Sequence, residues 1–154
     1  MRNRTFFLFT ASITYLVAAI GWLSVQAQTP ANPMIQLLPE RWQFKFLSEP
    51  DENLENTFYK PTFDDSAWGS IPVPANWEML GYEEPHYFYP DTKPRGLYRV
   101  SFRMPAQWQD QYTHLRLEGV SFGYTLWING HQLGSWHSAF QPAQFLIEPF
   151  IKKR

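Results

Sequence analysis

The chain has 154 residues, of which 44% are hydrophobic and 18% aromatic, and its formal charge at pH 7 is −1. This length and apolar content suit one domain, or part of one, and are too small for two. The near-neutral charge, with no basic run longer than residues 152–154, argues against nucleic-acid binding. Because there is no cysteine, disulfides, thiolate metal sites and thiol nucleophiles are excluded.

The N-terminal segment has the pattern of a signal peptide. Arg2 and Arg4 precede an uncharged apolar run over residues 6–25, and Ala27 ends a site with the small side chains that a signal peptidase recognises. We expect residues 1–27 to be cleaved, so that the mature protein is exported, periplasmic or secreted, with no membrane contact. The alternative is an uncleaved anchor, because about 20 apolar residues can span a bilayer.

Residues 28–40 contain three prolines and are expected to form an extended leader before one domain over residues 41–154. The domain opens with a predicted strand that has an aromatic face, because aromatic and polar residues alternate there. The aromatic positions of this strand are Trp42, Phe44 and Phe46.

Three connecting segments follow the first strand. Residues 49–59 are polar and acidic and are expected to form a solvated loop. Residues 61–74 read as a turn-rich connection, and residues 76–94 as a long aromatic loop with three prolines.

The clearest strand pattern covers residues 98–104, which we expect to line a core. Its apolar positions, Tyr98, Val100, Phe102 and Met104, alternate with Arg99, Ser101 and Arg103.

Residues 115–118 and 124–128 also alternate and predict two half-buried strands. Asn129-Gly130 follows the second run and favours the two positive φ angles of a type I′ turn, so a tight hairpin is expected. Short strands separated by turns, without a helical period after residue 28, indicate an all-β antiparallel sandwich.

Four motifs occur in order over residues 41–151. They are FDDSAW at residues 63–68, NWEMLGY at 76–82 with Pro85 and Tyr87 after it, GLYR at 96–99, and a W-x-N-G segment containing Gly119, Val120, Trp127, Asn129, Gly130 and Gly134. Together they closely resemble the N-terminal sugar-binding domain of glycoside hydrolase family 2, the β-galactosidase and β-glucuronidase family. The NWEMLGY element is similar to that of the β-galactosidase branch.

The resemblance implies a jelly-roll β-sandwich of the galactose-binding-domain type, incomplete at its C-terminus. In the family, this domain continues with further strands and is followed by an immunoglobulin-like sandwich and a catalytic (β/α)8 barrel. We therefore expect this chain to be the leading part of a larger enzyme, from a truncated gene, a frameshift or an incomplete gene model.

We identify no catalytic residue in the chain. Retaining glycoside hydrolysis needs two carboxyl groups about 5 Å apart, whereas the adjacent Glu83 and Glu84 are expected to point apart on an extended loop. Asp64 and Asp65 fall in a turn, where Asp binds local backbone amides. The chain should therefore be inactive alone. Its four histidines are too scattered for a metal site, and no cofactor is expected.

Three residues are candidates for substrate binding. The resemblance implies that Asn129 reaches the active site and hydrogen-bonds the bound sugar, although an Asn before Gly also suits the turn alone. Trp136 could stack on a sugar ring or fill the core, whereas Trp127, within a strand, is expected in the core. Tyr87 belongs to an aromatic loop over residues 82–89 that faces either the substrate or a neighbouring domain.

We interpret the chain as the sugar-binding portion of a β-galactosidase-like glycoside hydrolase without the catalytic barrel. Its expected partners are a β-galactoside or related carbohydrate and the missing C-terminal part of the enzyme. The alternatives are a self-standing exported carbohydrate-binding module and an anchored envelope protein that packs on a partner.

Overall fold

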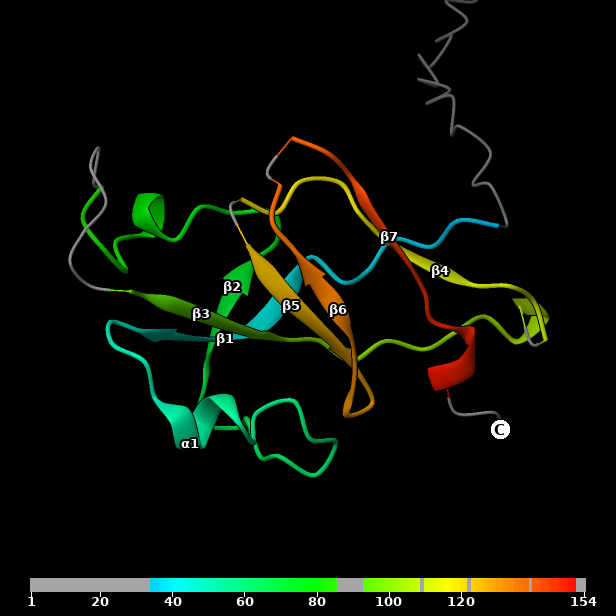
Figure 1. Cartoon of the computed structure of the whole chain (residues 1–154), viewed down its shortest axis with the longest axis horizontal. Coiled ribbons are helices and arrows are strands. Elements are labelled where there is room, and N and C mark those ends of the chain that lie inside the picture. The colour runs from blue at the N-terminus through cyan, green and yellow to red at the C-terminus, as the bar shows by residue number, and fades with distance from the viewer. Residues whose placement is uncertain (1–33, 86–92, 109, 122, 139, 152–154) are drawn as a thin grey trace, which may run out of the picture. The chain divides into compact units, whose positions relative to one another are not determined.

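The computed structural model describes residues 34–85, 93–108, 110–121, 123–138 and 140–151 (Figure 1). The predicted signal peptide, the first part of the predicted leader and Tyr87 lie outside these ranges. The helices are α1 (Glu52–Glu55), η1 (Glu78–Leu80), η2 (Ala106–Trp108) and η3 (Glu148–Phe150), of which the last three are 3-10 turns. The strands are β1 (Arg41–Leu47), β2 (Gly69–Pro72), β3 (Arg95–Arg99), β4 (His114–Leu117), β5 (Tyr124–Ile128), β6 (His131–Trp136) and β7 (Ala143–Leu146).

A three-stranded antiparallel sheet has the order β2-β1-β3 (Figure 1). It contains the two largest fully buried side chains of the described residues, Phe44 and Ile71. The predicted first strand is confirmed as β1, and Phe44 at its centre is only 2% exposed. The aromatic side chains of β1 pack with two rings from the NWEMLGY segment: Tyr82 meets Phe44 edge-on at 4.9 Å, and Trp77 meets Phe46 at 5.6 Å. The aromatic face of β1 is thus covered by that segment.

The strand predicted over residues 98–104 is wrong in its bounds. β3 ends at Arg99, where its pairing with β1 reaches Gln43. Residues 100–105 have no strand partner in the described part of the chain. The buried residue of β3 is Leu97, at 6% exposure, whereas Tyr98 on the opposite face is half-buried. Alternation predicts extended backbone, but the bounds of a strand depend on its hydrogen-bonded neighbour.

The acidic segment over residues 49–59 is more ordered than the predicted solvated loop. Asp51 accepts a hydrogen bond from the Leu54 amide at 3.0 Å and caps α1, as Asp does at helix starts. Three residues after the end of α1, Phe58 is 7% exposed and packs with Leu47 and Leu97 in a hydrophobic cluster. The charged composition of the segment concealed this single core residue.

The remaining strands form two separate pairs, β4 with β7 and β5 with β6 (Figure 1). Leu115 of β4 and Ala143 of β7 turn inward, at 9% and 2% exposure. The all-β prediction is confirmed, because strands dominate and α1 spans only four residues. Within the described residues, the three sheets do not close into one sandwich.

Candidate sugar-binding hairpin

The β5–β6 hairpin carries the residue that the sequence analysis placed first, Asn129. Its φ is 49° and that of Gly130 is 86°. A type I′ turn needs positive φ at both central residues, which Asn and Gly adopt most readily. The predicted tight hairpin is confirmed: Ile128 pairs with His131 directly across this turn.

The Asn129 side chain is held in place by the C-terminal turn. Its Nδ2 donates a hydrogen bond of 2.7 Å to the Phe150 carbonyl oxygen, and the Phe150 ring lies 5.4 Å from that of His131. A carboxamide has two N–H donors and one acceptor oxygen. The bond to Phe150 uses one of the two N–H donors of Asn129. The same contact ties the tip of the hairpin to η3.

The turn also rests on Pro61. A Cβ added to Gly130 would lie 3.0 Å from Cδ of Pro61, tighter than ordinary van der Waals contact. Glycine is therefore required here twice, by its positive φ and by the approach of the proline ring. Asn129 is exposed beside this close contact.

Trp127 packs against the hydrophobic cluster, as predicted for a strand residue. Its indole stacks on the Tyr59 ring at 5.2 Å with an interplanar angle of 5°, and meets Phe58 edge-on at 5.4 Å. Tyr59 and Phe58 belong to the loop after α1, so Trp127 joins the hairpin to that loop.

Trp136, the second candidate, lies in β6, the second strand of the hairpin. It pairs across the strands with Tyr124, at the open end of the hairpin. Asn129 lies at the other end, so the two candidates are separated by about five residue steps, or roughly 16 Å. The hairpin does not bring them to one point, and Tyr87 lies outside the described residues.

The Trp136–Tyr124 pair contains two buried polar atoms that have no hydrogen-bond partner among the described residues, Nε1 of Trp136 and the Tyr124 hydroxyl. Burial raises the pKa of Tyr124. The Tyr124 ring packs edge-on against Phe145 of β7 at a centroid distance of 6.4 Å. The open end of the hairpin is thus an apolar contact, unlike the polar tip.

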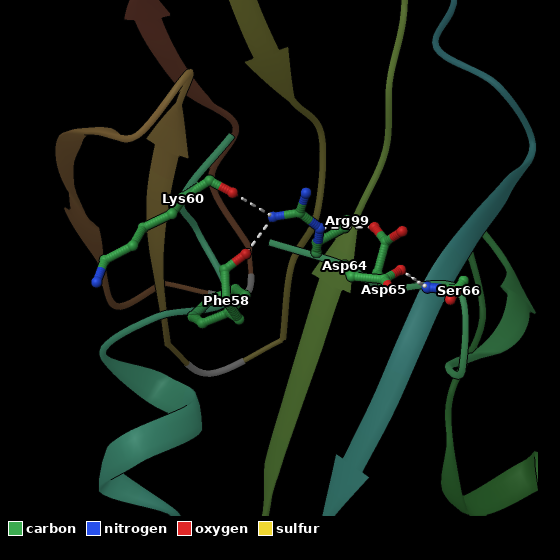
Figure 2. A network of polar contacts seen from close by, with 6 residues as sticks. All are labelled: Phe58, Lys60, Asp64, Asp65, Ser66 and Arg99. Carbon is green, nitrogen blue, oxygen red and sulfur yellow. Dashed lines mark hydrogen bonds and ion pairs between the residues drawn. The ribbon is translucent and has the colours of Figure 1, made fainter. Parts of the chain in front are cut away.

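The sequence analysis missed a network centred on Arg99, which Figure 2 shows. Nε of Arg99 donates to Oδ2 of Asp65 at 2.6 Å, and Nη1 donates to the carbonyl oxygens of Phe58 and Lys60. The guanidinium also lies 5.4 Å from the centre of the Phe63 ring. Asp65 was predicted to serve the turn alone, as Asp64 does by accepting from the Ser66 amide at 2.9 Å.

This network and the aromatic contacts explain most of the motif residues by packing. Asp65 of FDDSAW binds Arg99 of GLYR. Trp77 of NWEMLGY lies over Gly96 of GLYR, where an added Cβ would be 2.2 Å from the indole. The paired opposite charges in two motifs were the signal that could have revealed the ion pair.

Within the described ranges, no helix is long and apolar enough to cross a membrane. In the same ranges, no three His, Asp or Glu side chains gather closely enough to hold a metal ion.

Comparison with known proteins identifies relatives of this chain. The chain is 33% identical over 130 residues to a β-galactosidase of Vibrio cholerae, covering 77% of this chain and 13% of that protein. A β-galactosidase of Psychromonas ingrahamii is 34% identical over 127 residues, covering 75% and 12%. The chain thus spans about an eighth of the length of these curated relatives.

A solved structure gives the same family by fold. The β-glucuronidase of Bacteroides uniformis superposes with a TM-score of 0.57 and 28% identity, covering 75% of this chain and 13% of that one. The family model for the sugar binding domain of the glycosyl hydrolases family 2 matches residues 35–154. The chain belongs to glycosyl hydrolases family 2, and the matched part is its N-terminal sugar-binding domain.

Proposed function

We propose that this domain contacts the sugar substrate of a β-galactosidase-like glycoside hydrolase through the tip of the β5–β6 hairpin. The observation that carries the proposal is the position of Asn129, whose exposed amide is fixed at a type I′ turn by the 2.7 Å bond to Phe150. A fixed carboxamide can donate to one sugar hydroxyl and accept from another. Relatives at 33% and 34% identity that are β-galactosidases favour a β-galactoside as the sugar.

Hydrolysis itself is assigned to another part of the enzyme. The reaction requires two carboxyl groups about 5 Å apart across the glycosidic bond. Asp65, the carboxylate that binds Arg99 in the network, is already occupied by this ion pair at 2.6 Å. The purified chain should therefore leave an aryl β-galactoside intact, and turnover that follows the protein through purification would contradict this assignment.

The test of the sugar contact is a titration of the purified chain with methyl β-galactoside, followed by the NMR signals of the hairpin amides. Asn129→Gly removes the carboxamide and keeps the positive φ of the turn, so it should weaken sugar binding and reduce the shifts at the hairpin tip. Met79→Ala is a suitable control, because Met79 is 80% exposed and distant in sequence from the hairpin. Equal shifts in the wild type and Asn129→Gly would disprove the sugar role of Asn129.

A second candidate sugar is a β-glucuronide, because solved structures that the chain resembles are β-glucuronidases at 28% identity. A glucuronide differs from a galactoside in carrying a carboxylate, which favours a cationic partner. The same titration with methyl β-glucuronide distinguishes the two. Tighter glucuronide binding would replace the galactoside proposal and leave the sugar-binding role of the domain intact.

The expected partner is the C-terminal part of the enzyme, which would supply further strands and complete a jelly roll. Residues 100–105, which have no strand partner among the described residues, and the three separate sheets support this proposal, since unpaired strand edges favour further pairing. A chain whose stability and sugar affinity stay unchanged when the C-terminal part of the enzyme is supplied would instead favour a self-standing carbohydrate-binding module.

Export after cleavage at Ala27 completes the proposal, because the apolar run over residues 6–25 is followed by small side chains. Mass spectrometry of the product from its native host measures the N-terminus directly. A mature chain that begins at Gln28 supports export, whereas a membrane-bound full-length chain would identify the anchored alternative.

A further inference from the structure

We propose that Arg99 is a positioning residue for the Asn129 hairpin: by gathering the loop of residues 58–65 onto β3, it fixes the surface on which the hairpin rests. This inference deepens the proposed sugar contact of Asn129 and adds the residue that aligns it. Arg99 acts on Asn129 in three steps: the guanidinium holds the loop, the loop supports the hairpin, and the hairpin carries Asn129.

The first step is the binding of the loop by the Arg99 guanidinium. Arg99 and Asp65 side chains are 21% and 30% exposed, so their 2.6 Å ion pair is partly shielded from water. The same guanidinium donates to the carbonyls of Phe58 and Lys60, the latter at 3.3 Å (Figure 2). A planar guanidinium has five N–H donors in a rigid fork, whereas a lysine ammonium is a point charge that cannot span all three partners.

The second step is the contact between that loop and the hairpin. Tyr59 and Pro61 flank Lys60, whose carbonyl Arg99 binds. The Tyr59 ring stacks on Trp127 at 5.2 Å, and Cδ of Pro61 lies 3.0 Å from the Cβ position of Gly130. Arg99 therefore holds the backbone of the residues that support both β5 and its turn.

The third step is the dependence of the hairpin on this support. β5 and β6 pair with each other in a two-stranded sheet, and none of their residues is fully buried. An isolated hairpin is marginally stable in water. Its position therefore follows from side-chain contacts. These include the contacts with Tyr59, Phe58 and Pro61 on the Arg99 side, and the packing of Tyr124 on Phe145 and the Asn129–Phe150 bond elsewhere.

The test is hydrogen exchange of the purified chain, measured by mass spectrometry, with Arg99→Lys. Lysine keeps the charge beside Asp65 but lacks the planar set of N–H donors that binds the three partners. Amides at residues 127–131 should therefore exchange about tenfold faster, while β1 amides change little. Arg95→Lys is the matched control: the same change on the same strand, at a side chain that is 45% exposed. It should leave exchange in the hairpin at the wild-type rate.

Two more variants separate positioning from general loosening. Ile71→Val trims a fully buried side chain and should accelerate exchange across the strands together. Asp65→Asn weakens one arm of the fork and should accelerate the hairpin amides severalfold. If Arg99→Lys gives the uniform pattern of Ile71→Val, or leaves residues 127–131 unchanged, the proposal is overturned.

The sugar titration then connects the network to Asn129. Arg99→Lys should weaken methyl β-galactoside binding severalfold in the wild-type background. In the Asn129→Gly background it should cause no further loss of affinity, because Arg99 affects the sugar only through the position of Asn129. An additional loss in the double variant would overturn the series relation. If Asn129→Gly alone binds the sugar normally, the sugar role fails, while the exchange data still decide whether Arg99 positions the hairpin.

Discussion

The three-stranded sheet and the β5–β6 hairpin have similar alternating sequences but different degrees of burial. The sheet contains Phe44, Ile71 and Leu97, which are 2%, 0% and 6% exposed. Every residue of β5 is half-buried, and none reaches the level of those three. Alternation by itself therefore does not reveal which strand is stable by its own packing and which depends on neighbours.

The difference lies in what covers each surface. The aromatic face of β1 is covered by Trp77 and Tyr82, and on its other face Leu47 clusters with Phe58 and with Leu97 of the neighbouring strand β3. The hairpin is attached by a few specific contacts of Trp127 and Asn129. The sheet should accordingly resist local opening, whereas the hairpin should respond to changes in single contacts.

Phe44→Ala should have the largest effect, because it empties the centre of the sheet. Truncating a buried Phe costs about 3–5 kcal/mol in the free energy of unfolding, which urea denaturation followed by circular dichroism measures. Phe140→Ala makes the same chemical change at a side chain that is 95% exposed, and should stay within about 0.5 kcal/mol of the wild type. Comparable losses in both variants would refute the assignment of the core to the sheet.

Trp127→Ala should come next and act mainly on the hairpin. Its indole is half-buried, so we expect a loss of about 3 kcal/mol, at the low end for a large aromatic residue. Trp127→Phe retains a ring against Tyr59 and should lose less. Hydrogen exchange should show faster opening of β5 and β6 than of β1. A change in sugar affinity with unchanged melting would instead show that Trp127 binds ligand.

Gly96→Ala tests the contact between GLYR and NWEMLGY in the sheet. The added Cβ would lie 2.2 Å from Cζ3 of Trp77 and 2.8 Å from Cε2 of Tyr98. Such overpacking costs about 1–3 kcal/mol in the free energy of unfolding. Gly69→Ala on β2 is the control, since its Cβ would meet its nearest atom at 3.7 Å. A neutral Gly96→Ala would mean that Trp77 does not pack on β3.

The smallest effect concerns Asp64 and pH. The Ser66 amide, and after it the Ser66 hydroxyl, lower the pKa of Asp64 from 3.8. Because the folded pKa is the lower one, the ionised form adds stability above pH 3.8, and this is lost as pH falls through the folded value. Urea midpoints at acidic pH should fall less steeply in Asp64→Asn. Ser66→Ala keeps the backbone amide and should retain most of the pH dependence of the urea midpoint. A midpoint that does not change with pH in Ser66→Ala would contradict the leading role of the amide.

The sequence by itself determined the features that depend on near neighbours in the chain. Alternation located β1 and β5, and the positive φ needed by a type I′ turn located Asn129 and Gly130, because that requirement is met within the turn. The motifs, read in order, also identified the family, which the matched sugar-binding model bears out.

Tertiary structure decided the rest, because it depends on residues distant in the sequence. β3 ends at Arg99, since its register follows β1, although the alternation continues beyond it. Trp136 and Asn129 belong to one hairpin but lie at opposite ends of it. Arg99 meets Asp65 across 34 positions and the Phe58 carbonyl across 41. Local patterning cannot specify such pairs, because side chains far apart in the chain become neighbours only when the strands and loops pack together.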